Sequence, residues 1–146
     1  MMSRQCLILV IEDDPNLLRT LALILDHAGY VVTAAADVPA GQRHLEQSNF
    51  DLVILDITGS NADIGPLLAC LKYSQPQPPV IFLTGQAQSE VAAKLGSIET
   101  RGFLPKPVDP EHILAKVQAL LTERQITCPR ARYRPIAPTG HGQPGT

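Results

Sequence analysis

The first 124 residues switch repeatedly between short continuous apolar runs and longer segments whose apolar residues recur at helical spacing. A short continuous run bounded by turn residues is typical of a strand buried on both faces, whereas i, i+3, i+4 spacing is typical of an amphipathic helix. The runs predict strands over residues 5–11, 30–35, 50–55, 80–83 and 102–104. The remaining segments predict helices over residues 15–28, 37–47, 66–73, 89–95 and 110–123.

Local signals support these boundaries. Pro15 suits the first turn of the first helix and Gly29 its end, because proline lacks the amide hydrogen that a helix interior needs and glycine adopts positive φ freely. Asp37 suits the cap of the second helix, and Asp109 with Pro110 suits the start of the last one. Five strand–helix units in series predict an α/β fold, in which a parallel sheet is covered by helices on both faces through right-handed crossovers.

Composition limits the class of protein. The chain has 146 residues, of which 45% are hydrophobic and 18% charged, as is typical of one soluble globular domain. No apolar stretch approaches the ~20 residues that a membrane-spanning helix requires, and no secretory signal is recognisable, so we expect no membrane association and a cytoplasmic location. Three cysteines without a CxxC spacing argue against a disulfide framework and a zinc site, and we interpret Cys6 and Cys70 as small core residues.

Charge divides the chain near residue 124. Residues 1–124 hold all fourteen Asp and Glu against nine Lys and Arg, whereas residues 125–146 hold three Arg and no acid, together with several Pro and Gly. The second segment also has no apolar periodicity that could pack against a core. We therefore expect a folded domain over residues 1–124 and a flexible, basic, Pro- and Gly-rich tail over residues 125–146.

Polar residues suited to phosphoryl chemistry follow four of the predicted strands. The triplet 12–14 (Glu-Asp-Asp) follows the first strand, Asp56 the third, Thr84 the fourth and Lys106 the fifth. The carboxyl ends of parallel strands meet at one edge of a sheet, where open α/β folds bind ligands. Clustered carboxylates suit a hard divalent cation, and a hydroxyl with a lysine suits the oxygens of a phosphoryl group.

Each of these residues also has a purely structural interpretation. The acidic triplet would stabilise the start of a helix, Asp56 would cap one, and Thr84 would end a strand. Phe103 would be an ordinary core residue, and Lys106 a solvated surface lysine. Joint placement at four strand ends favours a functional site over these separate roles.

With these four blocks the chain resembles the response regulator receiver domain, the phospho-acceptor unit of two-component signalling. LILVIEDDP, DLVILDI, VIFLTG and GFLPKP match the family's blocks, in the family's order, across residues 5–123. The resemblance implies a flavodoxin-like (βα)5 doubly wound parallel sheet with strand order 2-1-3-4-5. This order brings the first and third strands side by side at the switch point where a ligand is expected.

The resemblance also implies a phospho-acceptor and a metal site. Asp56 matches the phospho-acceptor of the family. Glu12 and Asp13 match the acidic pair that holds a divalent cation, normally Mg²⁺, together with Asp56 and the main-chain carbonyl of Thr58. Asp14 lies one place beyond this pair.

Further residues match the family's switch. Lys106 corresponds to the lysine that reaches the phosphoryl oxygens, and Thr84 to the hydroxyl that follows the phosphoryl group after transfer. Phe103 occupies the aromatic switch position, which in the family turns inward when the threonine moves. The resemblance also implies a cis peptide bond between Lys106 and Pro107, an isomer that is accessible only before proline.

The loop after Asp56 departs from the family. It reads ITGSNADIG, with Ser60 where a proline is usual and Ile64 where a glycine is usual. An isoleucine cannot adopt positive φ without strain, so the turn must be made at another residue. Thr58 and Gln86 occupy the two positions that tune the lifetime of the phosphoryl group in the family.

These assignments predict a single-domain response regulator that is not an enzyme in its own right but a phospho-acceptor that assists its own phosphorylation and dephosphorylation. Phosphorelay from a histidine kinase or a histidine phosphotransfer protein would switch the face formed by the fourth helix, fifth strand and fifth helix, which would bind a downstream protein or a second copy of the chain. We expect no direct DNA binding, because the segment after residue 123 is too short and polar to form an output domain.

Two alternatives remain open. A degenerate receiver would act as a phosphorylation-independent protein interaction module, which the unusual loop favours and which has no need to bind Mg²⁺. An enzyme of the haloacid dehalogenase type would also phosphorylate an aspartate after a strand. It would need a second acid two places after Asp56, where this chain has Thr58, and such enzymes are usually longer.

Overall fold

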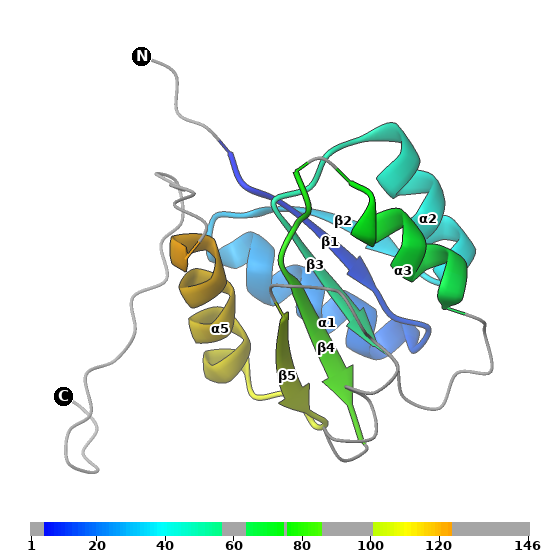
Figure 1. Cartoon of the computed structure of the whole chain (residues 1–146). Helices are drawn as coiled ribbons and strands as arrows, with labels where there is room; N and C mark the ends of the chain where they lie inside the picture. The colour runs from blue at the N-terminus through cyan, green and yellow to red at the C-terminus, as the bar shows by residue number, and fades with distance from the viewer. Residues whose placement is uncertain (1–4, 57–63, 75, 86–100, 124–146) are drawn as a thin grey trace, which may run out of the picture.

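The computed structural model describes residues 5–56, 64–74, 76–85 and 101–123 (Figure 1). Five parallel strands form one sheet: β1 (Leu7–Ile11), β2 (Val31–Ala35), β3 (Leu52–Asp56), β4 (Val80–Thr84) and β5 (Arg101–Pro105). The strand order is β2-β1-β3-β4-β5, which confirms the predicted order and the doubly wound fold class. β1 and β3 are therefore hydrogen-bonded neighbours, although β2 and two helices separate them in the chain.

Helices connect and cover these strands. The described ones are α1 (Pro15–His27), α2 (Val38–Gln47), α3 (Gly65–Lys72) and α5 (Pro110–Glu123). Their bounds agree with the sequence prediction to within a residue or two, and the fifth strand is one residue longer at each end than predicted. The helix predicted over residues 89–95 and the tail predicted over residues 125–146 lie outside the described residues. None of the helices that the structure describes is long and apolar enough to cross a membrane.

Two hydrophobic cores lie on opposite faces of the sheet. The core under α1 and α5, which we call the α1/α5 core, includes Leu21 and Leu25 of the first helix and Ile113 and Val117 of the last. The α2/α3 core lies on the other face and includes Leu67 and Leu71 of α3 together with residues of α2. Figure 1 shows α2 beside α3, and α1 and α5 on the other side of the sheet.

The strands alternate between these two cores. Ile8 and Val10 belong to the α1/α5 core, whereas Leu9 and Ile11 belong to the α2/α3 core. Every residue of β3 and β4 is buried. Burial on both faces explains why the strands read as continuous apolar runs in the sequence rather than as alternating ones.

The predicted helix boundary residues adopt the conformations that their side chains favour. The Asp37 carboxylate accepts a hydrogen bond of 2.8 Å from the amide of Ala40 and so caps α2. Gly29, which follows the last turn of α1, has φ 101°, a left-handed conformation that glycine adopts without strain. Gly29 thus lets the chain turn from α1 into β2, and Asp37 fixes the start of α2 after that strand.

The cysteines depart in part from expectation. Cys6 is buried in the α1/α5 core, as predicted, but it is also disulfide-bonded, which the cysteine count and spacing did not predict. Cys70 of α3 is half-buried with a free thiol, and its pKa is raised by burial and by the nearby charge of Glu46. Cys128 lies outside the described residues.

Gly41 allows α2 to approach β1 closely. A Cβ atom at this position would lie 2.4 Å from Cδ1 and 2.7 Å from Cγ1 of Ile11, which is 2% exposed. Ile11 is the last residue of β1 and directly precedes Glu12, the first of the candidate metal ligands. The glycine therefore sets the distance between α2 and the strand that carries the acidic pair.

We expect Gly41→Ala to lower the free energy of unfolding by about 1–2 kcal/mol, because overpacking a core costs about 1–3 kcal/mol and the helix propensity of alanine offsets only part of it. Urea unfolding followed by circular dichroism measures the change. Gly102→Ala is the matched control, since its Cβ would meet only the flexible stem of Lys116, at 3.0 Å. Equal stability of Gly41→Ala and the wild type would show that the helix can move away without cost.

Candidate functional site

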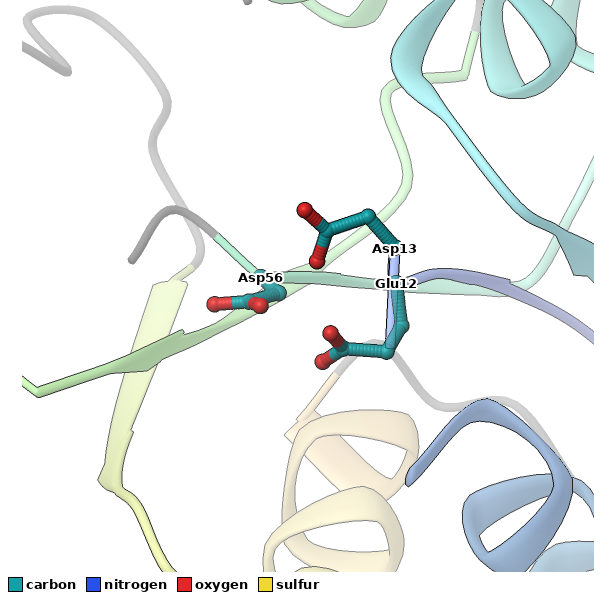
Figure 2. A group of neighbouring side chains, drawn as sticks. All are labelled: Glu12, Asp13 and Asp56. Atoms are coloured by element: carbon teal, nitrogen blue, oxygen red, sulfur yellow. The ribbon is translucent and has the colours of Figure 1, made fainter. Parts of the chain in front are cut away.

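Three carboxylates gather where β1 and β3 end (Figure 2). The parallel register places Ile11 opposite Leu55, so that Glu12 follows one strand beside Asp56, the last residue of the other. The amide of Glu12 donates to the carbonyl of Ala35 at 3.1 Å, which extends the pairing of β1 with β2 by one residue. One carboxylate oxygen from each of Glu12, Asp13 and Asp56 lies within 4.8 Å of the others.

The three carboxylates differ in burial. Glu12 is 1% exposed and Asp56 is 7% exposed, whereas Asp13 lies open to solvent. At this edge of the sheet, which we call the rim, two carboxylates are therefore buried and the third is exposed to solvent. An ion or a phosphoryl group could approach from the side of Asp13.

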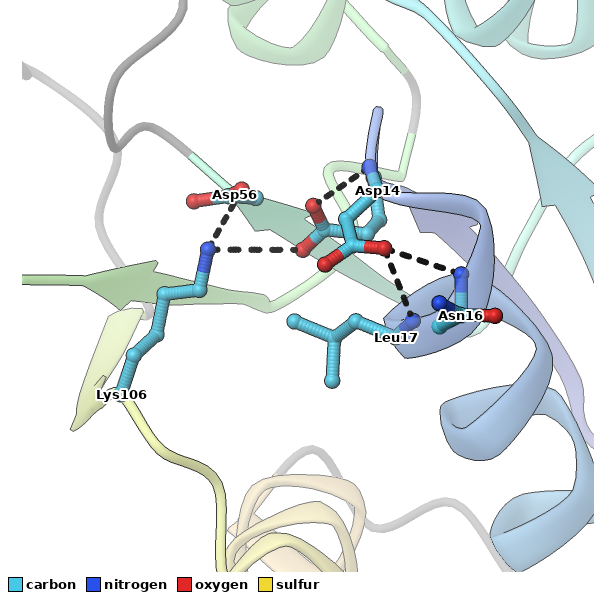
Figure 3. A network of polar contacts seen from close by, with 6 residues as sticks. Asp14, Asn16, Leu17, Asp56 and Lys106 are labelled. Atoms are coloured by element: carbon cyan, nitrogen blue, oxygen red, sulfur yellow. Dashed lines mark hydrogen bonds and ion pairs between the residues drawn. The ribbon is translucent and has the colours of Figure 1, made fainter.

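Lys106 supplies the positive charge of the site (Figure 3). Its Nζ donates a hydrogen bond of 3.0 Å to Oδ2 of Asp56 and lies 3.9 Å from Oε1 of Glu12. The backbone of this lysine is held by its amide, which donates to the carbonyl of Thr84 at 3.1 Å. The Lys106–Pro107 peptide bond is cis. The ends of β1, β3, β4 and β5 thus contribute to one constellation.

Burial and neighbouring charge shift the protonation of Glu12. Burial and, after it, the facing carboxyl of Asp56 raise the pKa of this carboxyl to about 8, although the amide of Asp14 and the charge of Lys106 act in the opposite direction. Without a bound cation, Glu12 therefore carries a proton at neutral pH for much of the time. The proton relieves part of the repulsion between the two buried carboxyl groups.

Lys106 remains charged. Burial alone would lower its pKa, but the hydrogen bond and the charge of Asp56, followed by the charges of Glu12 and Asp13, outweigh burial and raise the pKa above its usual value. A fixed ammonium group beside Asp56 is suited to contact the oxygens of an incoming phosphoryl group.

The residues present fit a hard divalent cation. Oε1 of Glu12 is buried and has no hydrogen-bond partner among the described residues, and it lies near the carboxylate oxygens of Asp13 and Asp56. Carboxylate oxygens with open access to water on one side are the ligand set that Mg²⁺ prefers, since this ion retains several of its waters. Thr58, whose carbonyl was predicted to complete the set, lies outside the described residues.

Asp14, the third acid of the triplet, has a structural role. Its carboxylate accepts hydrogen bonds from the amides of Asn16 at 2.9 Å and Leu17 at 3.4 Å, so it caps α1 (Figure 3). Its own amide donates to Oε2 of Glu12 at 3.0 Å. The helix-start interpretation of the triplet therefore holds for Asp14, while Glu12 and Asp13 join the cluster.

The predicted switch residues lie next to this rim. Thr84 ends β4 and is 3% exposed, and Phe103 lies half-buried on β5. Phe103 stacks on Phe82 of the neighbouring strand, a contact that sequence reasoning missed because it depends on how β4 and β5 pair. Gln86 lies outside the described residues.

Comparison with known proteins points to one family. A profile described as "Response regulator receiver domain" matches residues 8–118. The transcriptional regulatory protein GlrR of Escherichia coli K12 is 34% identical over 116 residues, which cover 80% of this chain and 26% of GlrR. The response regulator ArlR of Staphylococcus saprophyticus is 32% identical over 117 residues, which cover 78% of this chain and 51% of ArlR. The chain thus matches about half or less of the length of these curated relatives.

Solved structures that resemble this chain point to the same family. A CheY-like response regulator receiver domain protein from Methanospirillum hungatei superposes with a TM-score of 0.75 at 28% identity, covering 84% of this chain and 98% of that one. The chemotaxis protein CheY4 of Vibrio cholerae superposes with a TM-score of 0.73 at 25% identity, covering 81% of this chain and 100% of that one. Both similarities extend over nearly the whole described region.

The protonation of Glu12 predicts a pH dependence of stability in the absence of metal. The folded chain keeps this proton up to about pH 8, whereas the unfolded chain releases it near the ordinary glutamate pKa of 4.5. The folded state therefore binds more protons in this range, so stability is full below about pH 4.5 and falls as pH rises toward 8, by on the order of a few kcal/mol.

Urea unfolding in EDTA between about pH 5 and pH 8.5, a range that covers most of the interval between the two pKa values, measures this loss. Glu12→Gln should remove most of the dependence, because the amide does not titrate. The exposed Glu123→Gln is the control and should keep it. A wild-type stability that is flat or rises with pH would contradict the raised pKa.

Proposed function

This chain belongs to the response regulator receiver domain family, the phospho-acceptor domain of two-component systems, and from this premise we propose that Asp56 is its phospho-acceptor in a Mg²⁺-dependent transfer. The observation that carries the proposal is the constellation of Asp56 with Lys106 at 3.0 Å and with carboxylate oxygens of Glu12 and Asp13 within 4.8 Å. Such a group combines a nucleophile, a fixed cation and a set of metal ligands.

The transfer follows from the roles of these groups. A carboxylate oxygen of Asp56 forms the new bond to phosphorus while the bond from phosphorus to the imidazole nitrogen of a partner's phosphohistidine breaks, and that nitrogen keeps the electron pair. Bound at Glu12, Asp13 and Asp56, Mg²⁺ would neutralise the carboxylates and the phosphoryl oxygens. Lys106 would hold a phosphoryl oxygen from the other side. Thr58 would add a carbonyl ligand.

The input partner is a histidine kinase or a histidine phosphotransfer protein, the proteins with which receiver domains interact.

On the output side, phosphorylation adds about −1.5 to −2 charges at the rim. We propose that Thr84 and Phe103 respond to this charge and that the face including β5 and α5 then changes its affinity for a downstream protein or a second copy of the chain. Thr58 and Gln86 would tune how long the phosphoryl group persists.

The second candidate function, a phosphorylation-independent interaction module, gains no support from the described residues. A purely structural module has no need for buried carboxylates beside a fixed lysine, because replacing such groups by apolar ones is often neutral or stabilising. The two functions differ in Mg²⁺ affinity and in covalent modification, which the following experiments measure.

We expect incubation with acetyl phosphate and Mg²⁺ to add one phosphoryl group to the wild type, seen by intact-protein mass. Asp56→Asn and an EDTA control should show no adduct, because the first removes the nucleophile and the second the cation. Asp51→Asn is the matched control at the other end of the same strand, where Asp51 accepts a hydrogen bond from the amide of Leu7. An adduct that persists in Asp56→Asn would place the acceptor elsewhere.

The affinity for Mg²⁺ should depend on Asp13 but not on its neighbour Asp14. Asp13→Asn should weaken binding about tenfold or more, in line with the loss of one charged ligand, whereas Asp14→Asn should leave it nearly unchanged, because Asp14 caps α1. Isothermal titration measures both affinities. Equal losses in the two variants would mean that the acidic pair is assigned to the wrong residues, and no binding by the wild type would favour the interaction module.

A further inference from the structure

Phe82 and Phe103 form a ring pair on neighbouring strands. The parallel register of β4 and β5 places them directly opposite one another. Their ring centroids lie 5.6 Å apart with an angle of 28° between the planes, so the rings are stacked. This distance lies within the range in which offset-stacked aromatic pairs attract each other.

The ring pair adjoins the hydroxyl of the rim. Thr84 follows Phe82 by two residues in β4, and residues two apart in a strand share a face of the sheet. Phe82 and Phe103 both belong to the α2/α3 core. Phe82, Thr84 and Phe103 are therefore neighbours on one face of the sheet. Thr84 is the last residue of β4, and the two rings lie one step nearer the amino-terminal ends of the strands.

Burial defines the direction of the Phe103 ring. Phe82 is 0% exposed and lies at the centre of the α2/α3 core, while Phe103 is half-buried. The Phe103 ring packs against this core and stacks on a wholly buried ring, and we take this arrangement as the inward one. Phe82 therefore supplies the surface on which Phe103 lies in its inward arrangement.

We propose that Phe82 is a positioning residue of the switch, because the stack with Phe103 sets the balance between the inward and outward arrangements of that ring. The proposal rests on the proposed function, in which Phe103 responds to phosphorylation of Asp56. It adds a second residue, outside the rim, that determines how strongly the chain responds. If Phe82 only fills the core, its replacement lowers stability without changing this balance.

The size of the effect follows from the stacking energy. Aromatic pairs contribute about 0.5–1.5 kcal/mol beyond their buried area, which corresponds to a factor of about two to twelve in an equilibrium constant. A ligand or modification shifts a two-state element only by the difference of its interaction energies with the two states. Loss of the stack should therefore change the ratio of inward to outward arrangements by that factor.

Fluorine NMR can follow the ring, because the chain contains only three phenylalanines. Uniform incorporation of 4-fluorophenylalanine gives one signal each for Phe50, Phe82 and Phe103, assigned by single substitution to leucine. The change of each signal between H₂O and D₂O reports the exposure of that ring to solvent.

Phe82→Leu and Phe50→Leu form a matched pair. Both residues are buried phenylalanines of the α2/α3 core, but the described ring pair with Phe103 involves only Phe82. In Phe82→Leu we expect the Phe103 signal to shift toward that of an exposed ring, with a ratio of inward to outward arrangements lower by about two- to twelvefold. Phe50→Leu should leave the Phe103 signal unchanged. An equal response of Phe103 to both substitutions would overturn the proposal.

A second experiment distinguishes failure of the role proposed for Phe82 from failure of the proposed function. Beryllium fluoride with Mg²⁺ mimics a phosphoryl group on a carboxylate, and we expect it to increase the inward fraction of Phe103 in the wild type. Phe82→Leu should need a concentration higher by the same two- to twelvefold factor for the same inward fraction. If beryllium fluoride binds at Asp56 but acts equally on both proteins, Phe82 has no role in the switch, although the phospho-acceptor stands. If it fails to bind and acetyl phosphate gives no adduct, the phospho-acceptor assignment and the switch role both fail.

Discussion

Repulsion between three carboxylates is the constraint on which the site depends. Oxygens of Glu12, Asp13 and Asp56 lie within 4.8 Å of one another, and two unit charges ~4 Å apart repel by about 4 kcal/mol at an effective dielectric constant of 20. The protein offsets this repulsion in two ways: Lys106 contacts Asp56 at 3.0 Å, and a proton stays on Glu12, whose pKa is about 8. Because a cation can replace the proton on Glu12, the site is suited to bind positive charge.

The sheet prevents the carboxylates from moving apart. Glu12 and Asp56 extend from β1 and β3, which are hydrogen-bonded neighbours buried on both faces. Asp14 fixes the start of α1 directly after the acidic pair, and Gly41 lets α2 pack against Ile11 directly before it. A shift of the acidic pair away from Asp56 would disturb both helices and the strand ladder, which opposes such a movement.

The same rim is connected to the edge strand β5. The amide of Lys106 donates to the carbonyl of Thr84, and the register of β4 and β5 stacks Phe103 on Phe82. A change of charge at Asp56 therefore acts on a lysine that is bonded to the strand carrying Thr84. This short path through one hydrogen bond and one strand pair is the physical basis on which the proposed switch rests.

The sequence by itself determined the strands, most helix boundaries and the order of the chemical groups, because apolar periodicity and caps such as Asp37 depend on residues close together in the chain. Family resemblance added the strand order. Only the tertiary structure decided that Asp14 caps a helix while its two neighbours join Asp56, that Phe103 lies on Phe82, and that Cys6 is disulfide-bonded. These features depend on which distant segments meet and on how deeply each group is buried, and neither distance nor burial is a property of neighbouring residues in the sequence.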